Sequence, residues 1–335
     1  MKSIQTKLII SILAIFLVAL STLGGLNYWK ARDILNGTLT MEIAKEAESS
    51  AGDVGDWLEA RKMEITMLAK TPVIMGGNRE TIMPVIVAAA QASKIYYNIA
   101  YIDLSGNLTA STGSRVNVSD RSYFQQALKG EASISDPFVT RDSGHLVVTV
   151  VVPVLVDGKV SGALSGTVRI ASLAEKVMAV KVGQTGYAFV VQQDGLQIIH
   201  PSNEIAMKFN PLKDAGADPV QKQVVEHMVK GEKGIVILPV QQANQYHAYA
   251  PVPGTAWSLG ITVPVNEVTG AVSALTTVST LTIVVILAIT AIIITWYARR
   301  IARPIQVLEA AAKRIAGGDI TLHKLGIDSD DEIGR

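Results

Sequence analysis

The sequence lacks the residues and patterns that usually support catalysis. It has 335 residues and no cysteine, which excludes a disulfide framework and thiolate chemistry. Its five histidines show no close metal-ligand spacing, and no phosphate-cradling loop, nucleophile elbow or Rossmann glycine pattern is present. We therefore expect no enzyme activity, no metal and no cofactor. An anchored ectoenzyme whose site is built from remote residues is the alternative.

The chain also lacks an excess of either charge. Its 30 lysines and arginines are balanced by 29 aspartates and glutamates, which gives a formal net charge of +1. A protein that binds nucleic acid needs a basic surplus to displace counterions from the phosphates. We therefore expect no nucleic-acid partner.

Charged residues are absent from two long runs near the ends of the chain. Residues 8–26 carry no charge, and a helix of this length crosses about 30 Å of hydrocarbon. Tyr28 and Trp29 follow it as an interfacial anchor would. We predict a transmembrane helix over residues 8–28 after a cytoplasmic N-terminus of residues 1–7. A secretory signal peptide, for which Lys2 and Lys7 would supply the basic start, is the alternative.

The second uncharged run covers residues 268–298 and predicts another transmembrane helix over residues 274–297. Trp296 and Tyr297 close it, and three arginines follow within the next six residues. Aromatic residues followed by clustered arginines mark a cytoplasmic exit. Both termini are then cytoplasmic, and the intervening region, from about residue 30 to about 270, lies outside.

Two patterns of apolar residues divide this outer region. Residues 29–70 contain no proline, and their apolar residues recur at helical spacing, which predicts a stalk helix. Later segments are rich in Val, Ile and Tyr and are broken by turn residues such as Asp157-Gly158, which predicts strands in hairpins. The predicted strands are residues 95–103, 145–155, 159–170, 186–191, 197–200, 234–240, 245–250 and 256–263, with a helix at 171–180. The fold class is α+β with antiparallel sheets, arranged as two modules in series on a long helix.

Several short motifs resemble the double Cache sensor domains of bacterial chemoreceptors over residues 30–265. They are Arg121-Ser-Tyr123-Phe124, Ser135-Asp-Pro137-Phe138, Val152-Pro153-Val154, and the segment from Gly186 through Asp194-Gly195 to His200-Pro201. The resemblance implies two PAS-like antiparallel-sheet modules in a bacterial inner-membrane receptor. The membrane-distal module, residues 71–170, would bind a small ligand. The membrane-proximal module, residues 171–267, would couple it to the membrane.

The segment after the second apolar run resembles the first helix of a HAMP relay, which we place at residues 298–335. Its apolar residues at 301, 305, 308, 312 and 315 form a heptad seam, Pro304 sits where the helix would begin, and Gly317 and Gly318 would end it. Asp331-Glu332 resembles the start of a second, incomplete HAMP helix. We expect a homodimeric chemoreceptor that signals to a chemotaxis kinase and adaptor through a further cytoplasmic domain. The sensor half of a histidine kinase or diguanylate cyclase is the alternative.

The resemblance places the ligand against Arg121, Tyr123 and Phe124. Arginine offers a planar fork of donors that matches a carboxylate, and aromatic walls exclude water. An ion pair of Arg121 with Asp120 or Asp136, and core packing of the two aromatic residues, are the alternatives.

Residues that hold an amino acid in related sensors are replaced here. Two tyrosines fall on Val116 and Phe138, and the aspartate that holds the ammonium falls near Thr167. A buried ammonium without a carboxylate partner is costly, so these departures argue against amino-acid sensing.

Other basic residues favour an anionic ligand such as a small carboxylate. Arg169 shares a strand face with Thr167 if the alternation is regular, and Arg141 and His145 flank the preceding strand. Tyr101 lies on an early strand, one face of which should line the pocket. Solvated loop positions for Arg141 and His145, core packing for Tyr101, and sensing through a partner binding protein remain alternatives.

Overall fold

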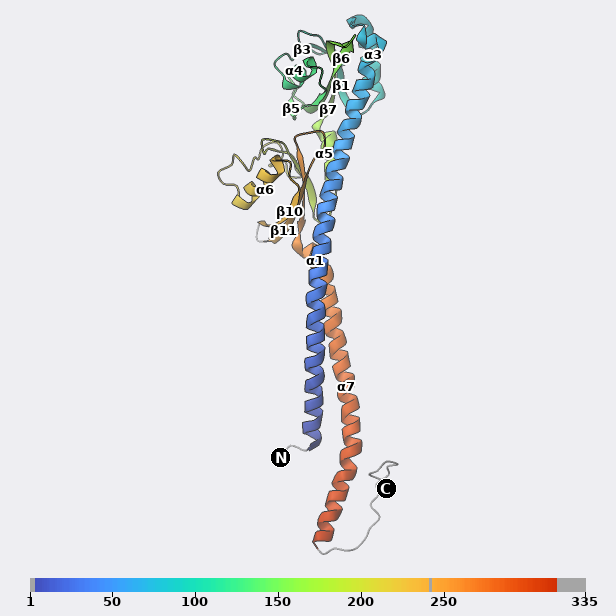
Figure 1. Ribbon diagram of the computed structural model, residues 1–335, viewed down its shortest axis with the longest axis vertical. Coiled ribbons are helices and arrows are strands. Elements are labelled where there is room, and N and C mark those ends of the chain that lie inside the picture. Colours follow the sequence, from blue (N-terminus) through green and yellow to red (C-terminus); the bar gives the residue numbers. More distant parts are fainter. Residues whose placement is uncertain (1–3, 241–242, 318–335) are drawn as a thin grey trace. The chain divides into compact units, whose positions relative to one another are not determined.

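The computed structural model describes residues 4–240 and 243–317 (Figure 1). The chain divides into two compact units. Thr38–Val268 forms one, which we call the sheet unit, and Met1–Gly37 with Thr269–Arg335 forms the other, which we call the helical unit.

Helix α1 (Ile4–Ala69) has 66 residues and joins the predicted membrane helix and stalk helix without a break. Within the sheet unit its buried face presents Ile43, Ala47, Val54, Leu58 and Ile65, which recur at the predicted helical spacing. The stalk prediction is therefore confirmed. Helix α1 ends at Ala69, and Pro72 occupies the first position of the next helix.

The first module follows α1 and contains a seven-stranded sheet. Its elements are α2 (Pro72–Met75), α3 (Arg79–Ala92), β1 (Tyr96–Ile102), β2 (Asn107–Ala110), β3 (Arg115–Asn117), α4 (Ser122–Leu128), β4 (Ser133–Ile134), β5 (Phe138–Val139), β6 (Leu146–Val156) and β7 (Lys159–Arg169). The strand order is β3-β2-β1-β7-β6-β4, with β5 paired to β6, and the pairings are antiparallel. Asp157 and Gly158 both have positive φ, 49° and 76°, as a two-residue hairpin turn requires. The predicted hairpin is thus confirmed.

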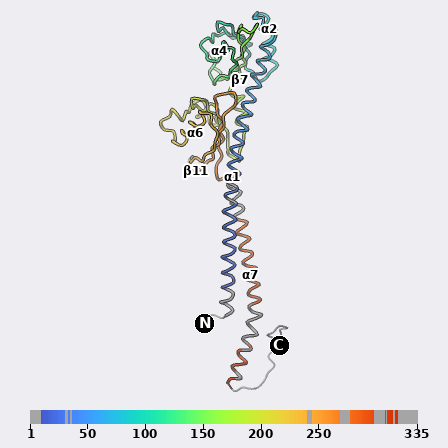
Figure 2. The backbone as a smooth tube through the Cα atoms, in the orientation of Figure 1, coloured from blue at the N-terminus to red at the C-terminus, as the bar shows by residue number. Residues whose placement is uncertain are grey.

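The second module contains a five-stranded antiparallel sheet of order β10-β11-β12-β8-β9. Its elements are α5 (Ile170–Met178), β8 (Tyr187–Val191), β9 (Gln197–Ile199), α6 (Pro219–Val229), β10 (Gly234–Val240), β11 (Ala243–Pro251) and β12 (Ser258–Pro264). The chain then passes from β12 directly into α7 (Val265–Ala316) (Figure 2).

Each sheet has α1 on one face and a short helix of its own module on the other (Figure 1). In the first module, Ile65 of α1 packs with Ile99 and Val150, whereas Phe124 of α4 packs with Ile102 and Val151. Strand alternation produces this division, since neighbouring residues of β6 face opposite sides of the sheet. In the second module α1 and α5 cover one face and α6 the other.

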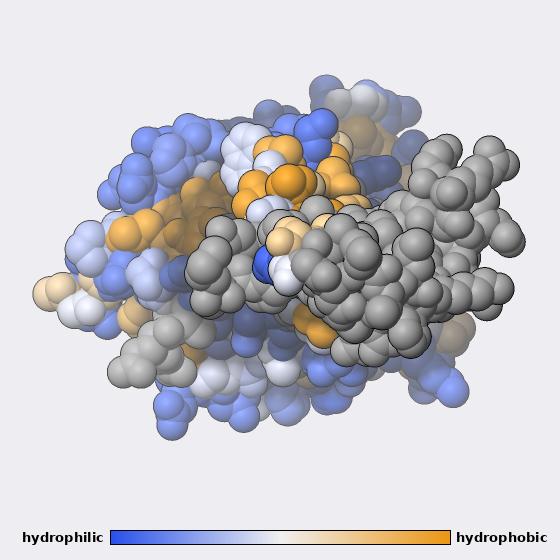
Figure 3. Space-filling view, turned by 90° about the horizontal axis from the view of Figure 1, so that it is seen from below, coloured by the Kyte–Doolittle hydropathy of each residue, from blue (hydrophilic) through white to orange (hydrophobic). Residues whose placement is uncertain are grey.

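The helical unit contains two segments that are long and apolar enough to cross a membrane, Ile10–Lys30 and Thr277–Tyr297. The described side chains of these segments are largely exposed and apolar. Figure 3, which views the molecule from below, shows hydrophobic residues at the surface beside hydrophilic ones.

Helix α7 differs from the expected relay helix in where it begins. We expected a helix to start near Pro304, but α7 runs unbroken through this position from Val265, so Pro304 lies in a helix interior. A continuous helix needs no new N-terminus there, although proline removes one backbone hydrogen bond. The helix ends at Ala316, where the glycines predicted its end. Asp331 and Glu332 lie outside the described residues.

Candidate ligand-binding site

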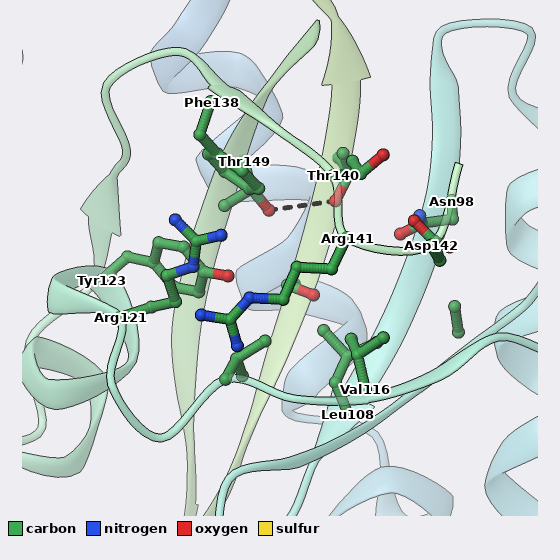
Figure 4. A pocket seen from close by; sticks show the side chains of 14 residues that line it. Asn98, Leu108, Val116, Arg121, Tyr123, Phe138, Thr140, Arg141, Asp142 and Thr149 are labelled. Carbon is green, nitrogen blue, oxygen red and sulfur yellow. Dashed lines mark hydrogen bonds between the residues drawn. The ribbon is translucent and has the colours of Figure 1, made fainter. Parts of the chain in front are cut away.

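A pocket opens on the face of the first sheet that carries α4 (Figure 4). It holds about 510 Å³ of space outside the protein atoms, part of it open to solvent. The strands contribute Asn98, Leu108, Ala110, Val116, Thr149, Ser165 and Thr167. The loop before α4, the start of α4, β5 and the loop after β5 contribute Val118, Arg121, Tyr123, Phe138, Thr140, Arg141 and Asp142. The mixture of apolar and polar groups suits a small organic molecule.

Polar side chains occupy the buried centre of the sheet beneath this pocket. Asn98, Thr149, Ser165 and Thr167 are each at least 92% buried. The hydroxyl groups of Thr149 and Thr167 lie 3.1 Å apart and share a hydrogen bond. Strand centres covered on both faces are usually apolar, so four polar side chains on one face indicate a surface that contacts a polar ligand or water.

Arg121 supplies a cationic group that no carboxylate contacts among the described residues, although its charge adds to the hydrogen bond from Arg141 in lowering the pKa of Asp120. It precedes α4 at the N-cap position, and its guanidinium carbon lies 5.0 Å from the centre of the Phe138 ring. Phe138 in turn stacks on Tyr123 with ring centres 5.6 Å apart. Within residues 4–240 and 243–317, the Arg121 side chain has no ion pair or hydrogen bond. An arginine held against an aromatic wall is suited to bind a carboxylate with two parallel hydrogen bonds.

Arg141 also extends into the pocket, but its charge is compensated (Figure 4). Its guanidinium donates to the Asp120 carboxylate at 2.6 Å and to the Asn117 carbonyl at 2.7 Å. The hydrogen bond from Arg141 holds the pKa of Asp120 below its ordinary value. Arg141 thus closes one side of the pocket and adds little net positive charge.

Asp142 places a carboxylate in the pocket lining. Burial raises its pKa, but hydrogen bonds from Ser114 and Ser143 outweigh this effect and leave the pKa below its ordinary value. The sequence motifs pointed to no carboxylate partner for an ammonium group, and Asp142 is one that they did not identify. Asp142 lies in the loop before β6, where strand alternation does not predict the direction of a side chain.

Five of the nine sequence-predicted site residues line the pocket: Arg121, Tyr123, Phe138, Arg141 and Thr167. The structure places Phe124 in the core under α4, where it is 1% exposed. Tyr101 packs on the opposite side of the sheet, toward the cluster formed with α1 and α3.

Arg169 and His145 gather around Tyr97 and do not line the pocket. The Arg169 guanidinium carbon lies 4.9 Å from the Tyr97 ring centre, and the His145 ring meets the same tyrosine edge to face at 5.0 Å. The register of β1 against β7 shifts between Tyr96 and Asn98, and this irregularity sets Tyr97 beside Arg169 at the end of the strand. The predicted convergence of these cations with Arg121 is therefore absent from the described residues.

Across the described part of the chain, no three His, Asp or Glu side chains lie close enough together to hold a metal ion. What the pocket offers is one free guanidinium, one carboxylate, aromatic walls and a hydroxyl-bearing floor.

Comparison with known proteins agrees with this architecture. The family model described as the Cache domain matches residues 31–272, which is most of the chain. The chain belongs to the Cache domain family. A HAMP domain model matches residues 296–335, which include the C-terminal part of α7.

Relatives and solved structures extend the match. The methyl-accepting chemotaxis protein McpB of Bacillus subtilis is 25% identical over 99% of this chain and 50% of its own length. The chain thus spans about half the length of the curated relatives it matches. The extracellular domain of the putative histidine kinase mmHK1S-Z2 superposes with a TM-score of 0.59 at 17% identity, covering 69% of this chain and 99% of that one. The ligand-binding domain of the Pseudomonas aeruginosa chemoreceptor PctB, solved with L-Arg, gives 0.54 at 20% identity, covering 68% and 95%. Both structures support the Cache fold.

Proposed function

We propose that this chain is the sensing part of a two-pass chemoreceptor of the bacterial inner membrane. The Cache and HAMP matches, the two candidate membrane segments and the similarity to methyl-accepting chemotaxis proteins along 99% of this chain support this assignment. Residues 71–170 form the membrane-distal, ligand-binding module and residues 171–267 the membrane-proximal module. The receptor acts as a homodimer and signals through HAMP to a chemotaxis kinase and adaptor. Similarity to a putative histidine kinase makes a kinase output the second candidate.

The ligand is a small molecule that carries a carboxylate. The observation that carries this proposal is the position of Arg121, which lines the pocket against Phe138 without an anionic partner among the described residues. Desolvation by the aromatic wall strengthens the contact with an anion. Such an anion needs no ammonium, so a simple organic acid fits the site.

An amino acid is the second candidate ligand, because Asp142 lines the same pocket as Arg121. A zwitterion needs one cationic and one anionic partner, and these two residues supply both. The PctB domain was solved with L-Arg, which shows that this fold accommodates such ligands.

Thermal unfolding of the full chain in lipid nanodiscs tests both candidates against a panel of organic acids, amino acids and amines. A ligand at a hundred times its Kd stabilises the native state by about 2.7 kcal/mol. Arg121→Ala should abolish the shift for every carboxylate, whereas the exposed strand variant Arg115→Ala should keep it. Asp142→Asn should weaken amino acids alone if the ligand is a zwitterion. A shift that persists in Arg121→Ala would contradict the proposed site.

The absence of native cysteine makes the proposed topology directly testable. A Ser105→Cys variant in the turn between β1 and β2 should react with a membrane-impermeant thiol reagent added to intact cells. A Lys313→Cys variant in α7 should react only after the cells are opened. The reverse pattern would overturn the topology.

A further inference from the structure

A hydrogen bond joins the wall of the ligand pocket to the second module. The Trp257 indole nitrogen donates to the Asp136 carboxylate at 2.8 Å. Trp257 is 2% exposed and belongs to the core of the second module, whereas Asp136 lies between β4 and β5 of the first. A buried indole N–H needs an acceptor, so this bond fixes the relative position of the two segments.

Residues on both sides of Asp136 in the sequence connect it to the pocket. Its neighbour Ser135 exchanges two hydrogen bonds with Thr149 of the pocket floor, at 2.9 and 3.0 Å. Phe138, two residues on, forms the pocket wall against which Arg121 is held. A ligand that binds the Arg121 guanidinium lies beside this ring. The segment from Ser135 to Phe138 thus links the pocket wall to Asp136.

Backbone hydrogen bonds also fix the position of Trp257 within the second module. Its carbonyl accepts from Val252 N at 2.8 Å, and its own N–H donates to the Thr255 hydroxyl at 3.1 Å. The same loop rests on α1, because a Cβ added at Gly55 would lie 2.9 Å from both Cδ and the carbonyl oxygen of Pro253. Trp257 immediately precedes β12, whose first residue is Ser258.

Strand β12 leads without a loop into α7. In the first turn of α7, Glu267 accepts hydrogen bonds from the backbone N–H groups of Gln184 and Thr185 at 2.7 and 3.1 Å and from the Thr185 hydroxyl. The start of α7 is thus clamped to the loop before β8. Both ends of β12 are fixed by side-chain hydrogen bonds, one to the pocket loop and one to this loop.

We propose that the Asp136–Trp257 hydrogen bond couples ligand occupancy in the pocket to β12 and the start of α7. Asp136 and Trp257 act as positioning residues: they do not touch the ligand, and their removal uncouples the modules without emptying the pocket. The inference rests on the proposed function in that it assigns the transmission step to the same pocket. Val148 packs within the core of the second module, but this contact is apolar and lacks the directionality of the hydrogen bond.

The test needs no knowledge of the natural ligand, because the chain contains no cysteine. Val116 lines the pocket, so a Val116→Cys variant can be tethered to 2-sulfonatoethyl methanethiosulfonate, which leaves a small anion in the pocket. Hydrogen exchange of residues 258–268 is then compared before and after tethering in the full chain in nanodiscs. Ser105→Cys, which carries the same group outside the pocket, is the matched control.

We expect tethering at Val116→Cys to change exchange in residues 258–268 by about threefold or more, and tethering at Ser105→Cys to leave it unchanged. Asp136→Ala and Trp257→Phe should remove this change while the pocket strands keep their response to the tether. Asp136→Asn retains an acceptor oxygen and should preserve it. Because the measurement is a difference on tethering, a general loss of stability does not imitate the result.

Three outcomes would overturn the proposal: no change at residues 258–268 in Val116→Cys, an undiminished change in both Asp136→Ala and Trp257→Phe, or its loss in Asp136→Asn. The tether occupies the pocket whichever ligand class is natural. Failure of the carboxylate panel therefore bears on the proposed function alone, and failure of the tether experiment bears on the coupling alone.

Discussion

Arg141 donates to Asp120 across 2.6 Å, with about half of each side chain exposed, and this pair removes one of the two cationic charges that line the pocket. Among the described residues the pocket then has one guanidinium without an ion pair, that of Arg121, and one carboxylate, that of Asp142. If the proposed function holds, selectivity between an organic acid and an amino acid would depend on which of these charges the protein neutralises by itself.

Release of Arg141 should strengthen the binding of anions. In Asp120→Asn the side chain still accepts a hydrogen bond, but the negative charge is gone, so we expect several-fold tighter binding of carboxylates at low salt. The gain should shrink at high salt, because the pair is exposed and its field is screened. Asp157→Asn, which removes one charge in the β6–β7 turn, is the control. Calorimetric titration at two salt concentrations checks this, and equal affinities in the two variants would contradict it.

Two glycines of α1 should respond in opposite directions to alanine. A Cβ at Gly52 meets no atom within 4 Å, so Gly52→Ala should stabilise the chain by about 0.5–1 kcal/mol through helix propensity. A Cβ at Gly55 would lie 2.9 Å from the Pro253 carbonyl oxygen, and backbone cannot yield as a side chain does. Gly55→Ala should therefore cost about 1–3 kcal/mol. Thermal unfolding of the pair is the measurement, and stabilisation by both would show that the loop at Pro253 moves freely.

The local chemistry of the sequence predicted part of this fold well. The Asp157-Gly158 hairpin depends only on two residues with positive φ, and the end of α7 at Ala316 only on the glycines that follow it. Helix α6 could have been predicted in the same way, because Asp218 caps it and Pro219 fills its first position. Helix α3 was missed although Asn78 caps it, since Pro84 in its interior argues against a helix.

The composition of the pocket was harder to predict, because it depends on irregular segments. Strands β2 to β5 have two to four residues each, too few for a period to be recognised. Arg169 has the strand position that alternation predicted, but the irregularity at Tyr97 gives it a different neighbour. Asp142 lies in a loop, where side-chain direction follows from tertiary contacts.

The paired hydroxyls of the pocket floor should show strong non-additivity. Thr149→Val leaves the buried Thr167 hydroxyl without the partner that lies 3.1 Å away, so we expect a loss of about 1–2 kcal/mol. The double variant Thr149→Val/Thr167→Val removes both polar groups and should cost no more than either single variant. Urea unfolding of the three variants gives the coupling energy. Additive losses would mean that the two hydroxyls do not depend on each other.

Acidification should destabilise the second module through a buried histidine. Burial lowers the pKa of His247 to about 4; its Nδ1 lies 3.2 Å from the Thr262 hydroxyl, and among the described residues its Nε2 has no partner. Between pH 6.5 and pH 4 the unfolded chain binds a proton at this position and the folded chain does not. Lowering the pH therefore favours unfolding, and the contribution of His247 is complete above pH 6.5 and lost as the pH falls toward 4. The shift corresponds to about 3 kcal/mol.

His247→Gln removes the titrating group and should flatten the dependence of unfolding free energy on pH in this interval. His200→Gln should reduce the slope as well, because burial also lowers the pKa of His200. Urea unfolding of the wild-type chain and both variants at several pH values between 4 and 7 measures the slopes. The carboxylates titrate in all three proteins, so the difference between slopes isolates each histidine. An unchanged slope in His247→Gln would mean that this side chain is charged or solvated in the folded protein, which its burial beside Thr262 of the neighbouring strand β12 opposes.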